Sequence, residues 1–240
     1  MKTIKHKTNK WLGKTFLAIT ATVNTVQAQT QNNIWSLSPN YYDNDNGQPF
    51  SLPQGPNAGF DYSGLPATNV HNAMQDANGN LLFFMVDDQV FDKDGYLIDY
   101  VYSNNVAVKG TAEIVFVPDP VNCQKYYIVA TGRSTYSVGF SNKIPYLATL
   151  DLSQTNTYYP SRYGALDYTG SGTASSIASI TPGFVVEPTK QGGVFIAASK
   201  LRSDNSRLVF ISNGYGIYRY KIDWTCNIIL DTKLSHAACL

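Results

Sequence analysis

Glutamate is scarce in this sequence, and helix-like patterning is absent from most of it. Aspartate supplies 15 of the 17 acidic residues, and Glu113 and Glu187 are the two glutamates. Glutamate suits helix surfaces, whereas aspartate suits turns and caps. No stretch of ten or more residues after position 30 repeats apolar side chains at the period of a helix. With 17 tyrosines and 11 phenylalanines, the composition favours strands joined by polar turns, and we predict an all-β protein.

Charge is also low, and the signatures of common catalytic sites are missing. Charged residues make up 15% of the chain and hydrophobic residues 43%, as in a globular protein. The sequence contains no Gly-x-Ser-x-Gly, P-loop, His-Glu-x-x-His or Gly-x-Gly-x-x-Gly motif, which excludes the enzyme classes that depend on them. His71 lies where a strand should begin and His236 lies near the C-terminus, so we reject a Ser-His-Asp triad. We therefore name no catalytic residue.

Cysteine is rare, and its positions do not define a disulfide. Cys123, Cys226 and Cys239 allow three single pairings, each of which leaves one thiol over. A Cys123–Cys226 bridge and buried or incidental thiols are both open interpretations. No Cys-x-x-Cys or His-x-x-x-His spacing occurs, so the sequence offers no zinc site.

The N-terminal region has the order of a secretory signal peptide. Residues 1–14 are basic and lack acids, and residues 15–26 are mostly apolar. Small or compact side chains stand at positions −3 and −1 of a cleavage after Ala28. The apolar stretch is too short for a membrane span, which needs about 20 residues. We therefore expect a signal peptide at 1–28 and an exported mature domain at 29–240, secreted or on the outer cell surface.

The expected mature chain is acidic. Five of the 18 basic residues and none of the 17 acidic residues lie in residues 1–28, so 13 basic residues face 17 acidic ones. The net charge changes from +1 for the whole chain to −4 for the mature chain. Nucleic acids and anionic membranes attract basic surfaces. The negative charge argues against both as partners, and we expect an extracellular protein or a glycan, with no nucleic acid and no membrane span.

Turn signals divide the first half of the mature chain. Residues 33–63 are rich in Asn, Pro, Gly and Tyr, and we interpret them as one short strand followed by a long irregular loop. Residues 69–100 contain two tight turns, at 77–80 with its Asn-Gly pair and at 92–95. Between them, residues 81–86 form a continuous apolar run, as expected for a strand that is covered on both faces.

Two later segments resemble each other in three consecutive places. Each has a strand next to a proline, then an aromatic strand, then a tyrosine-containing strand that ends in Asp, at an offset of about 70 residues. This order is typical of a propeller blade, a small antiparallel meander that buries its faces against neighbouring blades. The matched pairs are 113–118 with 183–188, 125–130 with 193–198, and 144–151 with 216–223.

The spacing of this repeat sets the number of blades. A blade takes about 40 to 45 residues, so the longer offset implies an inserted loop or a poorly marked blade at 158–179. The mature chain then holds about four to five blades, and closed propellers have about four to eight. Residues 226–240 resemble the outer strand of a blade and the start of a connection. We predict an incomplete β-propeller, which is the N-terminal part of a longer one or a truncated copy.

Several motifs carry a resemblance to a known group of proteins. Residues 72–84 followed by 90–98 resemble an N-terminal propeller blade of secreted Bacteroidetes proteins, which commonly carry a C-terminal type IX secretion sorting domain. Residues 115–118 with 126–129 are similar to the second blade of that group, and the likeness extends over about residues 33–150. The resemblance implies a surface or secreted protein used in adhesion or binding, and it supplies no catalytic residues.

Tyrosine pairs are the best candidates for ligand contact. Tyrosine offers a flat, amphipathic surface that suits glycans and proteins. Packing between blades explains the pair at 126–127, which falls in an expected strand. Tyr41, Tyr42, Tyr158 and Tyr159 fall in loop-like stretches, and we name them as the ligand-binding residues.

One loop has a weak calcium pattern. Asp43 and Asp45 alternate with asparagines and precede Gly47, as in calcium-binding loops. A third ligand before the glycine and a later bidentate acid are both missing. Calcium is therefore the one cofactor that the sequence suggests, with Asp43 and Asp45 as its ligands.

Two functions follow from these observations. The first is a non-catalytic binding or structural module at the cell surface, with a protein or glycan ligand. The alternative is a secreted glycoside hydrolase of propeller type, which needs two carboxyl groups about 5 to 9.5 Å apart. Glu113 and Glu187 each flank the first strand of a repeat unit, but at opposite ends of it. This placement favours the binding module.

Overall fold

The computed structural model consists of strands and the turns that join them. Every regular element in the part of the chain that it describes is a strand, which confirms the all-β prediction. Within this part, no helix has the length and hydropathy needed to cross a bilayer. The expected signal peptide lies outside it. The described residues are 34–43, 47–103, 106–107, 113–133, 143–167, 174–176, 194–213, 216–223 and 228–235.

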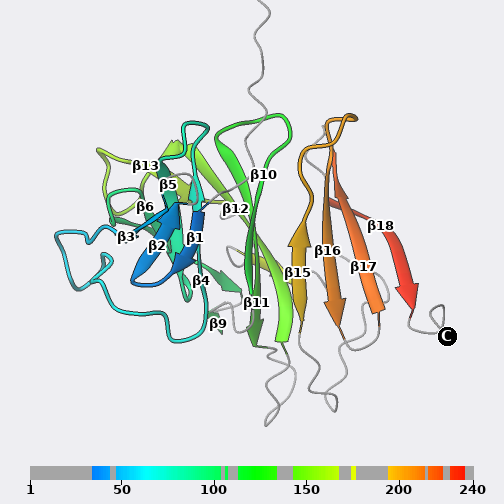
Figure 1. Cartoon of the computed structure of the whole chain (residues 1–240), viewed down its shortest axis with the longest axis horizontal. Coiled ribbons are helices and arrows are strands. Elements are labelled where there is room, and N and C mark those ends of the chain that lie inside the picture. Colours follow the sequence, from blue (N-terminus) through cyan, green and yellow to red (C-terminus); the bar gives the residue numbers. More distant parts are fainter. Residues whose placement is uncertain are drawn as a thin grey trace, which may run out of the picture.

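The strands form antiparallel sheets in chain order (Figure 1). The sheets are β1–β3, β4–β7, the pair β8–β9, β10–β13 with β14 paired to β12, and β15–β18. The strands are β1 Ile34–Leu37, β2 Asn40–Asp43, β3 Gln48–Ser51, β4 His71–Gln75, β5 Leu81–Val86, β6 Gln89–Asp92, β7 Leu97–Tyr100, β8 Tyr102–Ser103, β9 Val106–Ala107, β10 Ile114–Pro118, β11 Lys125–Arg133, β12 Lys143–Thr155, β13 Tyr163–Leu166, β14 Ala174–Ser176, β15 Phe195–Ala198, β16 Arg207–Asn213, β17 Gly216–Ile222 and β18 Ile228–Ser235.

The first sheet corrects one sequence expectation. The short strand at Ile34 is confirmed, but the long loop predicted after it is interrupted by β2 and β3. Tyr41 pairs with Phe50 and Tyr42 pairs with Pro49 across these two strands. Among the described residues, β3 pairs with β2 alone and is an edge strand. Proline lacks an N–H group, and an edge strand tolerates this lack because no further strand has to accept a hydrogen bond from it. The composition of this stretch is typical of turns, and it therefore gave no indication of the two strands β2 and β3.

The second sheet, β4–β7, confirms both predicted hairpin turns. Gly79 and Gly95 adopt positive φ values of 85° and 86°. These values are unfavourable for residues that have a Cβ atom. In the first turn, the carboxylate of Asp76 accepts the Asn78 and Asn80 amides at 2.8 and 2.9 Å. In the second, the carboxylate of Asp92 accepts two main-chain amides at 2.9 and 3.0 Å. The aspartate-rich composition is thus used to close turns.

The two turn glycines provide a matched pair of variants. A Cβ on Gly95 would lie 2.3 Å from the carbonyl oxygen of Pro53, whereas a Cβ on Gly79 would have no heavy atom within 4 Å. Gly79→Ala should therefore cost about 1 kcal/mol of unfolding free energy through its φ alone. Gly95→Ala should cost about 2 to 3 kcal/mol, because overpacking is added. Chemical denaturation of both variants measures the difference, and equal losses would contradict the close approach at Pro53.

The last two large sheets test the proposed repeat. Residues 144–151 and 216–223 coincide with β12 and β17, which are the third strands of their sheets, as matched. Residues 195–198 form β15, which is the first strand of the sheet as described, whereas the repeat placed them second. The second strand is β16, which pairs with both β15 and β17 and which we did not predict. Residues 183–188 lie outside the described part of the chain.

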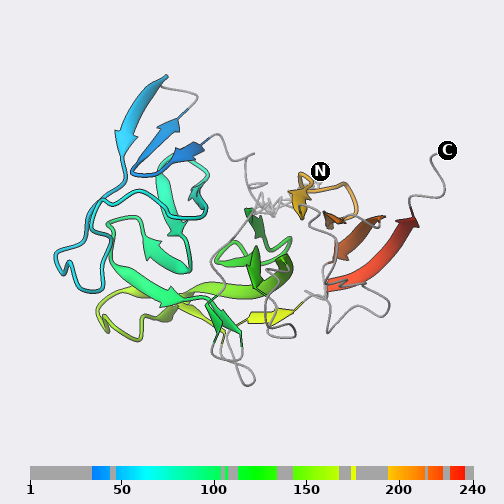
Figure 2. The same ribbon diagram turned by 90° about the horizontal axis from the view of Figure 1, so that it is seen from below.

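The sheets lie face against face along an arc (Figure 2). β4 contacts β1 on one side and β10 on the other, and β10 also contacts β15. The first strand of each of these sheets therefore lies next to the first strand of the sheet that follows it in the chain. At the other edge, β7 of the second sheet contacts β13 of the third. This arrangement positions loops from different sheets next to each other.

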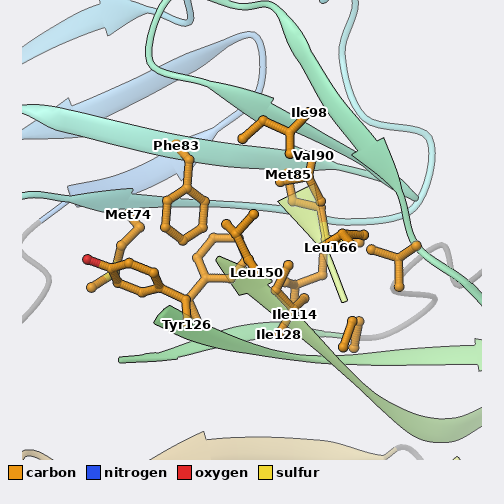
Figure 3. Packing of buried hydrophobic residues seen from close by; sticks show 14 of the residues in the cluster. Met74, Phe83, Met85, Val90, Ile98, Ile114, Tyr126, Ile128, Leu150 and Leu166 are labelled. Atoms are coloured by element: carbon orange, nitrogen blue, oxygen red, sulfur yellow. The ribbon is translucent and has the colours of Figure 1, made fainter. Parts of the chain in front are cut away.

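Apolar side chains fill the space between neighbouring sheets. Phe83 of β5 is fully buried, and its ring meets those of Phe116 and Tyr126 in edge-to-face geometry at 4.8 and 4.9 Å (Figure 3). A second cluster, on the opposite face of the β10–β14 sheet, joins it to β15–β18. Ile128 belongs to the first cluster, and its neighbour Val129 belongs to the second. The β10–β14 sheet is therefore covered on both faces.

Polar side chains connect the first strands across the sheet boundaries. The Asn72 side chain donates to the carbonyl oxygen of Ile114 at 2.7 Å, which joins β4 to β10. The carboxylate of Glu113 accepts the main-chain amide of Ile196, which joins β10 to β15. Each bond satisfies a backbone group that faces another sheet rather than its own. These contacts fix neighbouring sheets at their inner edges.

Candidate ligand-binding site

The first predicted tyrosine pair lies on a strand. Tyr41 and Tyr42 belong to β2, so their assignment to a loop-like stretch is wrong. The ring of Tyr41 stacks on Phe50 at 5.4 Å and packs against the core of the second sheet. Tyr42 points to the other side of the strand, where it is exposed. Tyr41 therefore contributes to packing, and Tyr42 keeps an accessible ring.

The second predicted pair lies in the connection between β12 and β13, as expected for a loop. The hydroxyl of Tyr159 donates to both carboxylate oxygens of Asp61, at 2.8 and 2.9 Å. Its ring meets Tyr96 edge-on at 5.0 Å. Asp61 is buried and also accepts the Leu97 amide at 2.9 Å. The Tyr159 side chain thus connects two segments that are 98 residues apart in the sequence.

An ion-pair cluster beside Tyr159 connects the same two parts of the chain. The guanidinium of Arg162 lies 3.7 Å from the centre of the Tyr96 ring. Its Nε donates to Asp92 at 2.5 Å, and its Nη2 donates to Asp94. The ammonium of Lys93, which bonds Asp94, and the nearby Arg162 hold the pKa of that carboxyl below its ordinary value. We call Asp61, Asp92, Asp94, Tyr96, Tyr159 and Arg162 the Arg162 clasp.

Tyr158 belongs to a different and more open group. Its hydroxyl interacts with the carboxylate of Asp99 on β7, which lowers the pKa of that carboxyl, and the residue is 43% exposed. Tyr100 and Tyr102 stack on each other beside it, with ring centres 5.6 Å apart and planes inclined by 28°. Tyr102 is 38% exposed. We call Asp99, Tyr100, Tyr102 and Tyr158 the tyrosine cluster.

Burial and negative charge set the electrostatics of the tyrosine cluster. Asp99 is 3% exposed, and burial raises the pKa of its carboxyl to about 6, although hydrogen bonds from the Tyr100 amide and from Tyr158 oppose the shift. The pKa values of Tyr102 and Tyr158 are raised, first by burial and then by neighbouring acidic groups. Those groups include Asp88 and Asp99. The cluster therefore combines accessible aromatic faces with a negative field.

The titration of Asp99 should be visible in the stability of the protein. Because its folded pKa of about 6 lies above the ordinary 3.8, the folded state binds the proton more tightly than the unfolded state, and stability falls as pH rises between these values. Asp99→Asn removes this loss. The variant should be more stable than the wild type by about 3 kcal/mol above the folded pKa and should match it below 3.8. Thermal or urea unfolding across this range measures the difference; a gap that does not change with pH would refute the assignment.

Sequence reasoning found one of the four members of this cluster. Tyr158 was singled out as a paired loop tyrosine, whereas Asp99, Tyr100 and Tyr102 were not. Tyr100 and Tyr102 are two residues apart, a spacing that places side chains on one side of an extended chain. That spacing was the available signal. The predicted pairs are also not brought together, since the sheet β1–β3 and the β12–β13 connection lie well apart in Figure 2.

The remaining predicted site residues are placed in part. Asp43 ends β2, but Asp45 and Glu187 lie outside the described residues, so the calcium loop and the carboxylate pair stay predictions. Within the described part, no group of three or more His, Cys, Asp or Glu side chains is arranged to hold a metal ion. Cys123 is exposed, and the other two cysteines lie outside the description, so the disulfide question stays open.

Comparisons with protein-family models, curated proteins and solved structures found no match for this chain. The resemblance to secreted Bacteroidetes proteins therefore stays a prediction from the motifs. The argument for the candidate site therefore comes from its geometry alone.

Proposed function

We propose that this protein is an exported β-propeller module that binds a protein or glycan at the cell surface without catalysing a reaction. Consecutive antiparallel meanders that cover each other's faces, with their first strands adjacent, support the propeller architecture. The signal-like N-terminal sequence supports export. Both inferences agree with the motif resemblance to secreted surface proteins.

The observation that carries the binding function is the tyrosine cluster. Tyr102 and Tyr158 are both accessible, and both are held in place: Tyr102 stacks on Tyr100, and the amide of Tyr158 donates to the Asn156 side chain at 2.7 Å. Pre-fixed aromatic side chains lose little conformational freedom on binding, which is why they dominate many recognition surfaces. The clasp tyrosine, Tyr159, is instead engaged within the molecule.

The hydrolytic alternative has no comparable support. The carboxylate of Glu113 is committed to the amide of Ile196 and joins two sheets. A catalytic acid or nucleophile must reach the scissile bond of the substrate. We therefore do not advance glycoside hydrolysis as a second function.

The test of the proposed function is binding by the purified protein to a glycan array and to intact cells of its source. Wild type and Tyr163→Ala should bind equally, because Tyr163 is 67% exposed but lies outside the cluster. A double variant, Tyr102→Ala with Tyr158→Ala, should lose at least about tenfold in affinity, as expected for central aromatic contacts. Unchanged binding by the double variant would contradict the assignment, and release of shortened sugars from a bound glycan would favour the hydrolase.

A further inference from the structure

The chain already contains one site where tyrosine and aspartate bind a cation. In the Arg162 clasp, the guanidinium lies on the Tyr96 ring and is held by the carboxylates of Asp92 and Asp94. Each component has a physical role. The ring face attracts a cation through its quadrupole, and the carboxylates supply charge and hydrogen-bond acceptors.

The tyrosine cluster contains the same components in a more accessible position. Tyr102 corresponds to the ring. Asp88 and Asp99 correspond to the acids, since the carbonyl of Asp88 accepts the Val101 amide at 2.7 Å and the carboxylate of Asp99 accepts the Tyr100 amide at 2.8 Å. Tyr158 adds a second exposed tyrosine, whose pKa is raised in part by Asp99. The buried carboxylate is shielded from water, so its field is screened less than that of a surface acid.

We propose that the tyrosine cluster binds an arginine or lysine side chain of a partner protein, with the cation against the Tyr102 and Tyr158 rings and near Asp88 and Asp99. This inference rests on the proposed binding function and selects a protein ligand over a glycan. A neutral sugar would use the rings but would not be attracted by the charge of the buried Asp99, which a ligand cannot contact directly. A basic side chain uses both, as Arg162 does within the chain.

The test compares two peptides that differ in charge but hardly in shape. Acetyl-Gly-Arg-Gly-amide carries a guanidinium, whereas the citrulline counterpart carries a neutral urea group in its place. Titration is followed by NMR of ring-labelled tyrosines above the pKa of Asp99. The arginine peptide should shift the Tyr102 and Tyr158 signals and bind about tenfold more tightly than the citrulline peptide, as expected for a partly desolvated cation–π contact. Equal affinities, or no shift of these two signals, would overturn the inference.

Two variants separate recognition from folding. Asp99→Asn should reduce the preference for arginine to about threefold or less, because the neutral amide removes one charge. The same variant is expected to be more stable at that pH, so weaker binding would not reflect unfolding. Tyr163→Ala should leave the preference unchanged. Full arginine preference in Asp99→Asn would contradict the role of the acid.

The outcomes also distinguish this inference from the proposed function. If glycans bind in a manner that depends on Tyr102 and Tyr158 while the arginine peptide does not, the binding module stands and the basic ligand is wrong. If neither ligand class binds through these tyrosines, both proposals fail.

Discussion

Phe83→Ala should lower the free energy of unfolding by about 4 kcal/mol, within the range measured for buried phenylalanines. The side chain is fully buried at the boundary between two sheets, where it meets Phe116 and Tyr126 edge-on. Its removal takes apolar area from the core and leaves a cavity that two sheets would have to close by moving. Urea denaturation followed by tyrosine fluorescence measures the loss.

A matched phenylalanine gives the control. Phe195 lies on β15 and is exposed, so Phe195→Ala should cost less than about 1 kcal/mol. Similar losses for the two variants would mean that the β4–β7 and β10–β14 sheets do not depend on their contact through Phe83.

Asp61→Ala should also lower the free energy of unfolding by about 4 kcal/mol, because it breaks a buried, charge-assisted network. The carboxylate accepts the amides of Asn57 and Leu97 and the hydroxyl of Tyr159. Alanine would leave the Leu97 amide buried without this acceptor and would remove the contact of Tyr159 with Asp61, although Arg162 and Asn156 still join the β12–β13 connection to the second sheet. Denaturation measures the first effect, and hydrogen exchange at Leu97 measures the second.

The control for this variant is an exposed carboxylate with an equally short contact. Asp231 pairs with Arg219 at 2.6 Å on the surface, so Asp231→Ala should cost less than about 1 kcal/mol. If Asp61→Ala is as mild as Asp231→Ala, or if Leu97 exchanges no faster, the buried hydrogen bonds of Asp61 do not stabilise the fold as stated.

Local sequence signals predicted the elements whose cause is local. The apolar run at 81–86 is β5, and both Asp- and Gly-containing turns adopt the expected conformation. No sequence signal predicted β16 between β15 and β17, because strand order depends on pairing with residues far along the chain. A run of aromatic residues indicates a strand, but it does not indicate which other strand pairs with it.

The candidate site shows the same division. The exposure of Tyr158 follows from its loop position, but the engagement of Tyr159 depends on Asp61, which lies 98 residues earlier. The raised pKa of Asp99 depends on burial that the stacked sheets create. The ligand class is a prediction that the binding experiments above address.

The stacking of sheets on both sides of β10–β14 is the claim on which the site and its energetics depend. Methyl NMR of the wild-type protein with a soluble paramagnetic agent tests it without any substitution. Ile128 and Val129 are neighbours on β11 that point to opposite faces, and both are buried. Their methyl signals should both stay sharp, whereas those of exposed Val121 and Ile217 should broaden. Strong broadening of either Ile128 or Val129 would show that one face of this sheet is open to solvent, as in a two-layer sandwich, and would contradict the account.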